Sequence, residues 1–154
     1  MSYWLMKSEP TTFSIEDLKK AHQHTSGWEG VRNYQARNFM RDKMQTGDLA
    51  FFYHSSCKIP GIVGIMKIVK AAYPDPSAWD PNSPYYDPKS SIENPRWVQV
   101  DVQFMREFST ILPLSAIKFL SELKDFVLIR PGNRLSIMPV SPHEWESILK
   151  LEKK

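Results

Sequence analysis

Three segments with β-strand patterns occupy the middle of the chain and limit the folds that it can adopt. Residues 49–54 are aromatic and aliphatic, residues 61–69 are rich in β-branched side chains, and residues 97–104 alternate between apolar and polar positions. These patterns are typical of strands, and the alternation indicates a strand with one buried face. The first two segments, separated by a loop over residues 55–60, predict an antiparallel hairpin with a longer loop.

Further strands and short helices flank this centre. Residues 3–7 and 135–140 have strand-like composition. Ser14, Asn33 and Ser141 are predicted N-caps of helices, because their side-chain oxygens can accept from backbone N–H groups of a first turn. The sum is five or six strands with peripheral helices, which predicts an α+β domain built on a small, partly open barrel or curled sheet. A length of 154 residues predicts a single domain over residues 1–154.

Composition excludes several classes of protein. A net charge of +3 permits a nucleic-acid partner without requiring one. The single cysteine, Cys57, excludes an internal disulfide and favours a reducing compartment, which we expect to be the cytoplasm. The first residues do not resemble a signal peptide, and no apolar run reaches the length of a membrane span. We expect a monomer.

A proline-rich segment interrupts the strands between residues 74 and 95. It holds six of the twelve prolines, and Trp79, Tyr85 and Tyr86 lie among them. Proline removes backbone donors and fixes φ, so the segment is predicted to be an irregular loop. Its aromatic residues argue against disorder, and a long ordered loop in a compact domain is typical of a functional element.

Catalytic chemistry has one weak candidate. Cys57 follows His54 by three residues, and a cysteine nucleophile needs a base within hydrogen-bonding reach. The sequence supplies no clear third group to orient that base, although a hydrolase or nucleic-acid-modifying enzyme that uses His54, Cys57 and Asp80 remains an alternative. The simpler interpretation is that Cys57 has no catalytic role and is a thiol in the loop of a hairpin.

Cofactor and metal motifs are absent from the sequence. There is no phosphate-binding glycine loop, so nucleotide cofactors lack their usual cradle. His22 and His24 have no further ligands at metal-binding spacing. Asp75, Asp80 and Asp87 each precede a proline, so turn initiation explains them better than calcium does. We expect neither a cofactor nor a metal.

Residues 27–44 combine aromatic rings with amides and arginines. Arg32 and Asn33 lie at the start of a predicted helix, where free N–H groups favour an anion. Arg37 and Arg41 share one face of that helix, which fits either a solvated surface or a phosphate clamp. A planar base is held by an aromatic face and by hydrogen bonds to its edge. The aromatic candidates for stacking are Trp4, Trp28, Tyr53 and the pair Tyr85–Tyr86.

Six blocks of sequence together resemble the EVE domain family. They are YWLMKSEP (3–10), WEGVRNYQARNFMR (28–41), FYHSSCKIPGIVGI (52–65), AYPDPSAWDPNSPYYDPKS (72–90), NPRWVQVDV (94–102) and RLSIMPVSPHEW (134–145). They cover nearly the whole chain. Eukaryotic members carry a basic N-terminal extension that this sequence lacks, so the resemblance predicts a free-standing bacterial member.

The resemblance implies a PUA-like fold and a reader of modified bases in DNA or RNA, with modified cytosine as the leading ligand. YTH domains, which are similar in fold, place a Lys-Ser pair and a tryptophan at an aromatic cage. The residues that the family motifs and this analogy assign to ligand binding are Trp4, Lys7, Ser8, Trp28, Arg32, Asn33, Gln35, Arg37, Asn38, Tyr53, His54, Ser55, Tyr86, Arg134 and Ser136.

The sequence therefore predicts a non-enzymatic nucleic-acid-binding module. In this hypothesis Trp28 stacks on the base, Asn33 and Ser8 read its edge, and Lys7, Arg32, Arg37 and Arg134 hold phosphate and sugar. Besides the enzyme, the second alternative function is a protein-interaction module that uses the aromatic loop 74–95 as its contact surface.

Overall fold

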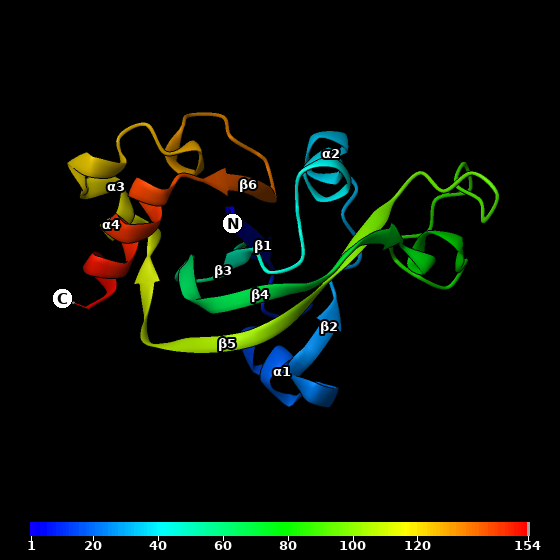
Figure 1. Ribbon diagram of the computed structural model, residues 1–154, viewed down its shortest axis with the longest axis horizontal. Coiled ribbons are helices and arrows are strands. Elements are labelled where there is room, and N and C mark those ends of the chain that lie inside the picture. The colour runs from blue at the N-terminus through cyan, green and yellow to red at the C-terminus, as the bar shows by residue number, and fades with distance from the viewer. Residues whose placement is uncertain (154) are drawn as a thin grey trace.

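The computed structural model describes residues 1–153 and has a curled, mixed sheet at its centre (Figure 1). The strand order is β2-β5-β4-β3-β1-β6, in which β1 is parallel to β3 and the other neighbours are antiparallel. The strands are β1 (Tyr3–Ser8), β2 (Thr25–Gly27), β3 (Leu49–His54), β4 (Gly61–Pro74), β5 (Val98–Pro113) and β6 (Ile137–Val140). The α-helices are α1 (Ile15–Lys20), α2 (Tyr34–Asp42), α3 (Leu114–Phe119) and α4 (Pro142–Glu152). This architecture confirms the predicted α+β class with a PUA-like curled sheet.

The two faces of the sheet carry separate hydrophobic cores. Successive side chains of a strand point to opposite faces, so Trp4 and Met6 of β1 join one core whereas Leu5 joins the other. The first core packs against α1 and α2 and the second against α3 and α4. Because both faces are covered, the central strands are apolar throughout, as the sequence of residues 49–54 indicated.

The sheet curls where the register of strand pairing shifts. The pairing of β3 with β4 shifts register between Phe52 and Tyr53, and the pairing of β4 with β5 shifts at four places. Such bulges bend a strand and increase its local twist. A large pocket lies beside the end of β1 and the turn that follows β3.

The predicted helix starts are confirmed. The hydroxyl oxygen of Ser14 accepts from the N–H of Asp17 at 3.1 Å, and the Asp17 carboxylate accepts from the N–H of Ser14 at 2.8 Å, which completes a capping box. The side-chain oxygen of Asn33 accepts from the N–H of Ala36 at 2.9 Å. Ser141 begins α4 with a second capping box.

The strand predictions need correction at several points. β4 continues to Pro74 and does not end at residue 69. β5 continues to Pro113 and does not end at residue 104, because its far end pairs with the start of β4, where Pro113 lies opposite Gly61. The strand is also covered on both faces at its start, where Trp97 and Gln99 are buried. The short strand β2 was not predicted, since three small polar residues carry no alternation.

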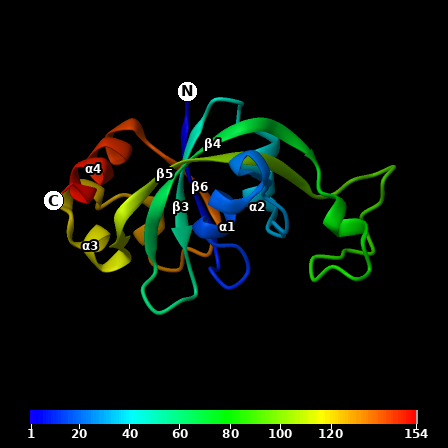
Figure 2. The same ribbon diagram turned by 90° about the horizontal axis from the view of Figure 1, so that it is seen from below.

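β4 and β5 extend beyond the body of the molecule and carry loop 75–97 (Figures 1 and 2). In both views this loop projects at one end of the two strands, and α3 and α4 lie at the other end. Asp75, Asp80 and Asp87 accept from the N–H groups of Ser77, Asn82 and Lys89, two residues on in each case. The turn interpretation of these aspartates is confirmed.

Candidate nucleic-acid interface

A large pocket opens where the end of β1 and the turn after β3 meet segment 26–32, which leads into α2. Its volume is about 1020 Å³, and residues from β1, the 55–56 turn, segment 26–32, loop 75–97 and the 134–136 segment line it. A volume of this size is ample for one nucleotide, since small-molecule sites span roughly 300–1,000 Å³. The pocket gathers seven of the predicted ligand residues: Lys7, Ser8, Trp28, Arg32, Ser55, Arg134 and Ser136.

The other predicted residues do not line this pocket. Most of them have roles within the fold, whereas Gln35 and Tyr86 are exposed. These residues are Trp4, Asn33, Gln35, Arg37, Asn38, Tyr53, His54 and Tyr86.

Trp4 and Tyr53 are core residues. The indole N–H of Trp4 donates to the buried Asp48 carboxylate at 3.0 Å, and the ring packs against Phe39. Trp4 instead borders a second, shallower groove of about 510 Å³. Tyr53 has 3% of its surface exposed, and burial raises the pKa of its hydroxyl to about 12.

Arg37 and Asn38 bind each other on α2. The Nε and Nη2 groups of Arg37 donate to the Asn38 side-chain oxygen, and Nη1 donates to the carbonyl of Arg96 at 3.0 Å. The guanidinium also lies over the Tyr34 ring, which in turn stacks on Trp97. This cluster fastens α2 to the end of loop 75–97. Asn33 is occupied as the N-cap, and Gln35 is exposed beside it.

Arg32 lines the pocket, but its guanidinium is already fully bonded. Nε and Nη2 donate to the carbonyl of Tyr85 at 3.0 and 2.7 Å. Nη1 donates to the carbonyl of Val31 and to the carboxylate of Asp75, and Nη2 donates to the hydroxyl of Ser77. All five N–H groups of an arginine are thus engaged within the protein. Arg32 ties segment 26–32 to loop 75–97 and has no donor left for a phosphate, contrary to the role assigned from sequence.

Trp28 forms the floor of the pocket and is also part of the core. Its ring meets the rings of Phe13 and Phe52 edge to face, at interplanar angles of 90° and 78°. Only 6% of its surface is exposed. A ligand can therefore reach a small part of Trp28, and a complete stacking face has to come from another residue.

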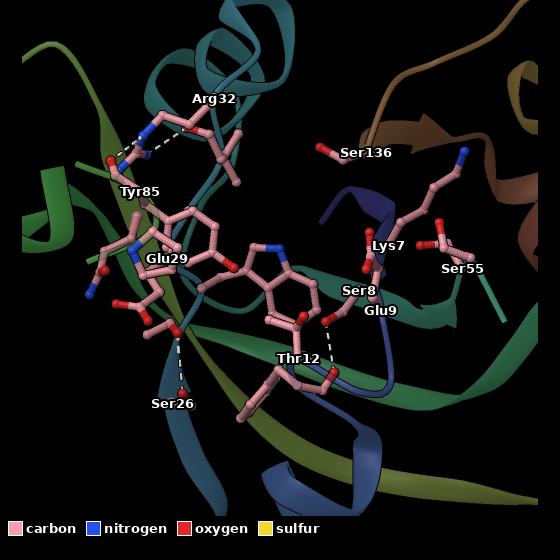
Figure 3. A pocket seen from close by; sticks show the side chains of 18 of the residues that line it. Lys7, Ser8, Glu9, Thr12, Ser26, Glu29, Arg32, Ser55, Tyr85 and Ser136 are labelled. Carbon is pink, nitrogen blue, oxygen red and sulfur yellow. Dashed lines mark hydrogen bonds between the residues drawn. The ribbon is translucent and has the colours of Figure 1, made fainter. Parts of the chain in front are cut away.

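Tyr85, rather than Tyr86, is the tyrosine of the pocket wall. Gly30 has a φ of +83°, and a Cβ added there would lie 2.6–2.7 Å from the Tyr85 ring. The ring thus packs directly on the glycine backbone and turns toward the cavity (Figure 3). Tyr86 is 43% exposed and lies outside the pocket. Tyr86 was the residue predicted from the sequence, but Tyr85 lines the pocket, because the outcome depends on contact with Gly30, a residue far away in the chain.

The two sides of the pocket differ in chemistry. Figure 3 shows Tyr85, Glu29 and Ser26 on one side and Lys7, Ser55 and Ser136 on the other. Burial lowers the pKa of Lys7, whereas burial and the charge of Asp75 raise the pKa of Glu29 against the opposing effect of Arg32. Neither Lys7 nor Arg134 forms an ion pair within residues 1–153. The pocket therefore has Tyr85 and Glu29 on one side, and on the other the unpaired cation of Lys7 with two hydroxyl groups and the carboxylate of Glu9.

No hydrogen bond joins His54 to Cys57 within residues 1–153. The Nε2 atom of His54 accepts from the N–H of Ile15 at 3.1 Å, so that nitrogen is unprotonated and occupied. Burial lowers the pKa of His54, and nearby Glu107 opposes this effect. Cys57 is a free, partly exposed thiol. Within the described part of the chain, no three His, Cys, Asp or Glu side chains gather as metal ligands, and no helix is long and apolar enough to cross a membrane.

Comparison with known proteins places this chain in one family. The EVE domain model matches residues 2–151. Human thymocyte nuclear protein 1 is 49% identical over 170 residues, which cover 99% of this chain and 75% of the relative.

Two solved structures are closely similar along their whole length. A protein from Pseudomonas syringae superposes with a TM-score of 0.94 at 52% identity, covering 98% of this chain and 99% of the other. Human thymocyte nuclear protein 1 in complex with DNA containing 5-methylcytosine superposes with a TM-score of 0.95 at 48% identity, covering 100% and 99%. The chain belongs to the EVE domain family.

Proposed function

We propose that this protein is a non-enzymatic, single-domain module that binds nucleic acid by taking one modified base, a modified cytosine, into the pocket over Trp28. The observation that carries the proposal is the two-sided chemistry of this pocket in a chain similar to a protein solved with 5-methylcytosine DNA. A base must leave its stack to be read so closely, and a pocket with an aromatic side and a cationic side suits an extruded nucleotide.

The aromatic side receives the base. Tyr85 offers the more accessible ring, and the exposed part of Trp28 forms the floor beneath it. Arg32 holds Tyr85 in place by hydrogen bonds to its backbone carbonyl, and Gly30 packs directly against its ring. In this proposal Arg32 positions the wall and does not touch the ligand.

The cationic side receives the backbone. Lys7 and Arg134 carry unpaired positive charge, and Ser55 and Ser136 add hydroxyl groups beside Lys7 (Figure 3). Two such cations suit a binding mode with few phosphate contacts, which agrees with a net charge of only +3. We propose that one monomer binds one modified nucleotide.

A binding panel tests the proposal. Fluorescently labelled DNA and RNA oligonucleotides, each with one central cytosine, 5-methylcytosine, 5-hydroxymethylcytosine or N6-methyladenine, are titrated with the protein and followed by anisotropy. Binding that is tighter for a modified cytosine than for cytosine supports the reader, and the DNA and RNA series decide the polymer. Equal affinity across the panel contradicts it.

Alkylation of Cys57 separates the reader from the cysteine-enzyme alternative. The thiol is partly exposed and lies near the pocket without a hydrogen-bonded base. We expect the alkylated protein to keep most of its affinity for the preferred oligonucleotide. Turnover of an oligonucleotide by the unmodified protein, lost on alkylation, would support the enzyme instead.

A further inference from the structure

The backbone around Glu29 is fixed on both sides of the residue. The N–H of Trp28 donates to the carbonyl of Val100 at 2.8 Å, and the N–H of Gly30 donates to the carboxylate of Asp75 at 2.9 Å. Glu29 stands between these two anchors and its side chain lies at the pocket beside Tyr85 and Ser26 (Figure 3). A carboxylate carried by so well-anchored a segment can read a ligand with little loss of backbone freedom.

The Glu29 carboxylate has no hydrogen-bond or ion-pair partner within residues 1–153. Arg32 is the nearest candidate cation, and all its donors are engaged elsewhere. Asp75, by contrast, accepts from Gly30, Arg32 and Ser77 and is fully satisfied. Glu29 is an exposed residue at the pocket, and the partial burial of its carboxylate and the Asp75 charge raise its pKa. A donor brought by a ligand would stabilise the carboxylate.

Several other polar side chains of the pocket use their donor groups within the protein. The hydroxyl of Ser26 donates to the carbonyl of Gly27 at 3.1 Å, and the side-chain amide of Gln99 donates to the hydroxyl of Tyr73. The hydroxyl of Ser8 donates to the carbonyl of Phe13 at 2.7 Å, and Asn33 is an N-cap outside the pocket. The hydroxyl proton of Ser8 is thus occupied and Asn33 is remote, whereas Glu29 offers an unpaired carboxylate beside the aromatic wall.

A carboxylate is selective for one feature of a pyrimidine. 5-Methylcytosine and thymine share the 5-methyl group and differ on the Watson–Crick edge, where cytosine has an exocyclic amine and thymine a carbonyl oxygen. A carboxylate accepts from the amine, as in acidic contacts to cytosine N4, and repels the carbonyl. A reader of methylated cytosine has to reject thymine, because the methyl group alone does not separate the two bases.

We propose that Glu29 is the specificity-determining residue of this pocket, and that it selects a base with an exocyclic amine over thymine by accepting a hydrogen bond from that amine. The proposal rests on the proposed function and deepens it by naming the group that reads the base edge.

The substitution Glu29→Gln tests this role while keeping the size of the side chain. Glutamine can present either its oxygen or its N–H₂ group, so it can donate to thymine O4 where glutamate repels it. Glu9→Gln is the matched control, because Glu9 is a second carboxylate of the same pocket that lies beside Lys7 on the opposite side (Figure 3). Short single-stranded DNA probes with one central 5-methylcytosine or thymine avoid differences in base-pairing energy.

Anisotropy titrations then compare the two probes for each protein. We expect the wild type to prefer 5-methylcytosine over thymine by roughly tenfold, which is within the range for one good base contact. Glu29→Gln should bring the ratio close to one by tightening thymine binding, a gain that partial unfolding cannot mimic. Glu9→Gln should keep the wild-type ratio.

Two outcomes would overturn the proposal in distinguishable ways. A folded Glu29→Gln protein with the wild-type ratio would show that another group reads the edge, while the pocket keeps its function. A wild type that binds neither probe, nor any oligonucleotide with a modified cytosine, would overturn the proposed function and this inference together.

Discussion

Arg32 donates to the carboxylate of Asp75 and so joins segment 26–32 to loop 75–97. The distance from Nη1 to Oδ2 is 3.2 Å, and the Asp75 side chain has no exposed surface. The same arginine lies 5.3 Å from the Trp97 ring centre and 5.7 Å from that of Tyr85. Arg32 therefore links the buried Asp75 carboxylate to the backbone of Tyr85, the aromatic wall that the proposed ligand would touch.

Replacing Arg32 by methionine should destabilise the protein by about 3 kcal/mol, because it leaves the buried Asp75 carboxylate without its cation. Urea denaturation followed by tryptophan fluorescence measures this change. Arg41→Met is the control, since Arg41 pairs with its neighbour Asp42 on the surface and should matter little. Equal urea midpoints for the two variants would show that the contacts of Arg32 with Asp75 and Tyr85 do not stabilise the fold.

Gly30→Ala should weaken oligonucleotide binding as well as stability. The left-handed backbone at Gly30 costs a non-glycine residue about 1–2 kcal/mol, and the added Cβ would also displace the Tyr85 ring. Gly47→Ala carries a similar backbone strain at a φ of +100° but meets no atom within 4 Å. We expect both variants to lose stability and only Gly30→Ala to lose affinity in anisotropy titrations.

Local chemistry made much of the fold predictable. The caps at Ser14, Asn33 and Ser141 depend on residues within one helical turn, and the strands at 49–54 and 61–69 are marked by their own composition. These features need no knowledge of distant contacts.

The pocket was only partly predictable, because its residues are sorted by long-range partners. Arg32 and Lys7 are both basic residues in family motifs. Arg32 donates all its hydrogen bonds within the protein, mostly to loop 75–97, whereas Lys7 has no ion-pair partner. Glu29 adjoins Trp28 in the sequence and was missed, since nothing local shows that a carboxylate will lack a partner. The choice between Tyr85 and Tyr86 likewise depends on distant Gly30.

Tyr85→Ala should reduce affinity for the preferred oligonucleotide by roughly 1–3 kcal/mol, the range for a base stacked on an aromatic ring. The alanine keeps the backbone carbonyl to which Arg32 donates, so these two hydrogen bonds are retained. Tyr86→Ala is the adjacent control and should bind as the wild type does. Trp28→Ala is a poorer test, because removal of a core tryptophan costs about 3–5 kcal/mol of stability.

Lys7→Gln should lower the salt dependence of binding. One lost phosphate contact reduces the slope of log K against log salt by about 0.7 for single-stranded DNA. Lys19→Gln is the control, because Lys19 pairs with Glu107 away from the pocket. Anisotropy titrations at several salt concentrations give both slopes, and an unchanged slope for Lys7→Gln would remove Lys7 from the phosphate side.

His54 should make the stability of the protein depend on pH. Its Nε2 atom accepts from the N–H of Ile15, so the folded state favours the neutral ring, and burial holds the pKa below its ordinary value of 6.5. As the pH falls through that value the unfolded chain takes up a proton first, and the free energy of unfolding decreases until the folded ring is protonated too.

Melting temperatures measured from about pH 8 down to about pH 5 should therefore fall more steeply for the wild type than for His54→Gln. Glutamine can keep an acceptor for the Ile15 N–H and has no charge to gain. At the upper end of the range the two proteins should melt at similar temperatures, because the histidine is neutral in both folded and unfolded states. Parallel curves over the whole range would show that this hydrogen bond tolerates protonation and that other groups govern acid unfolding.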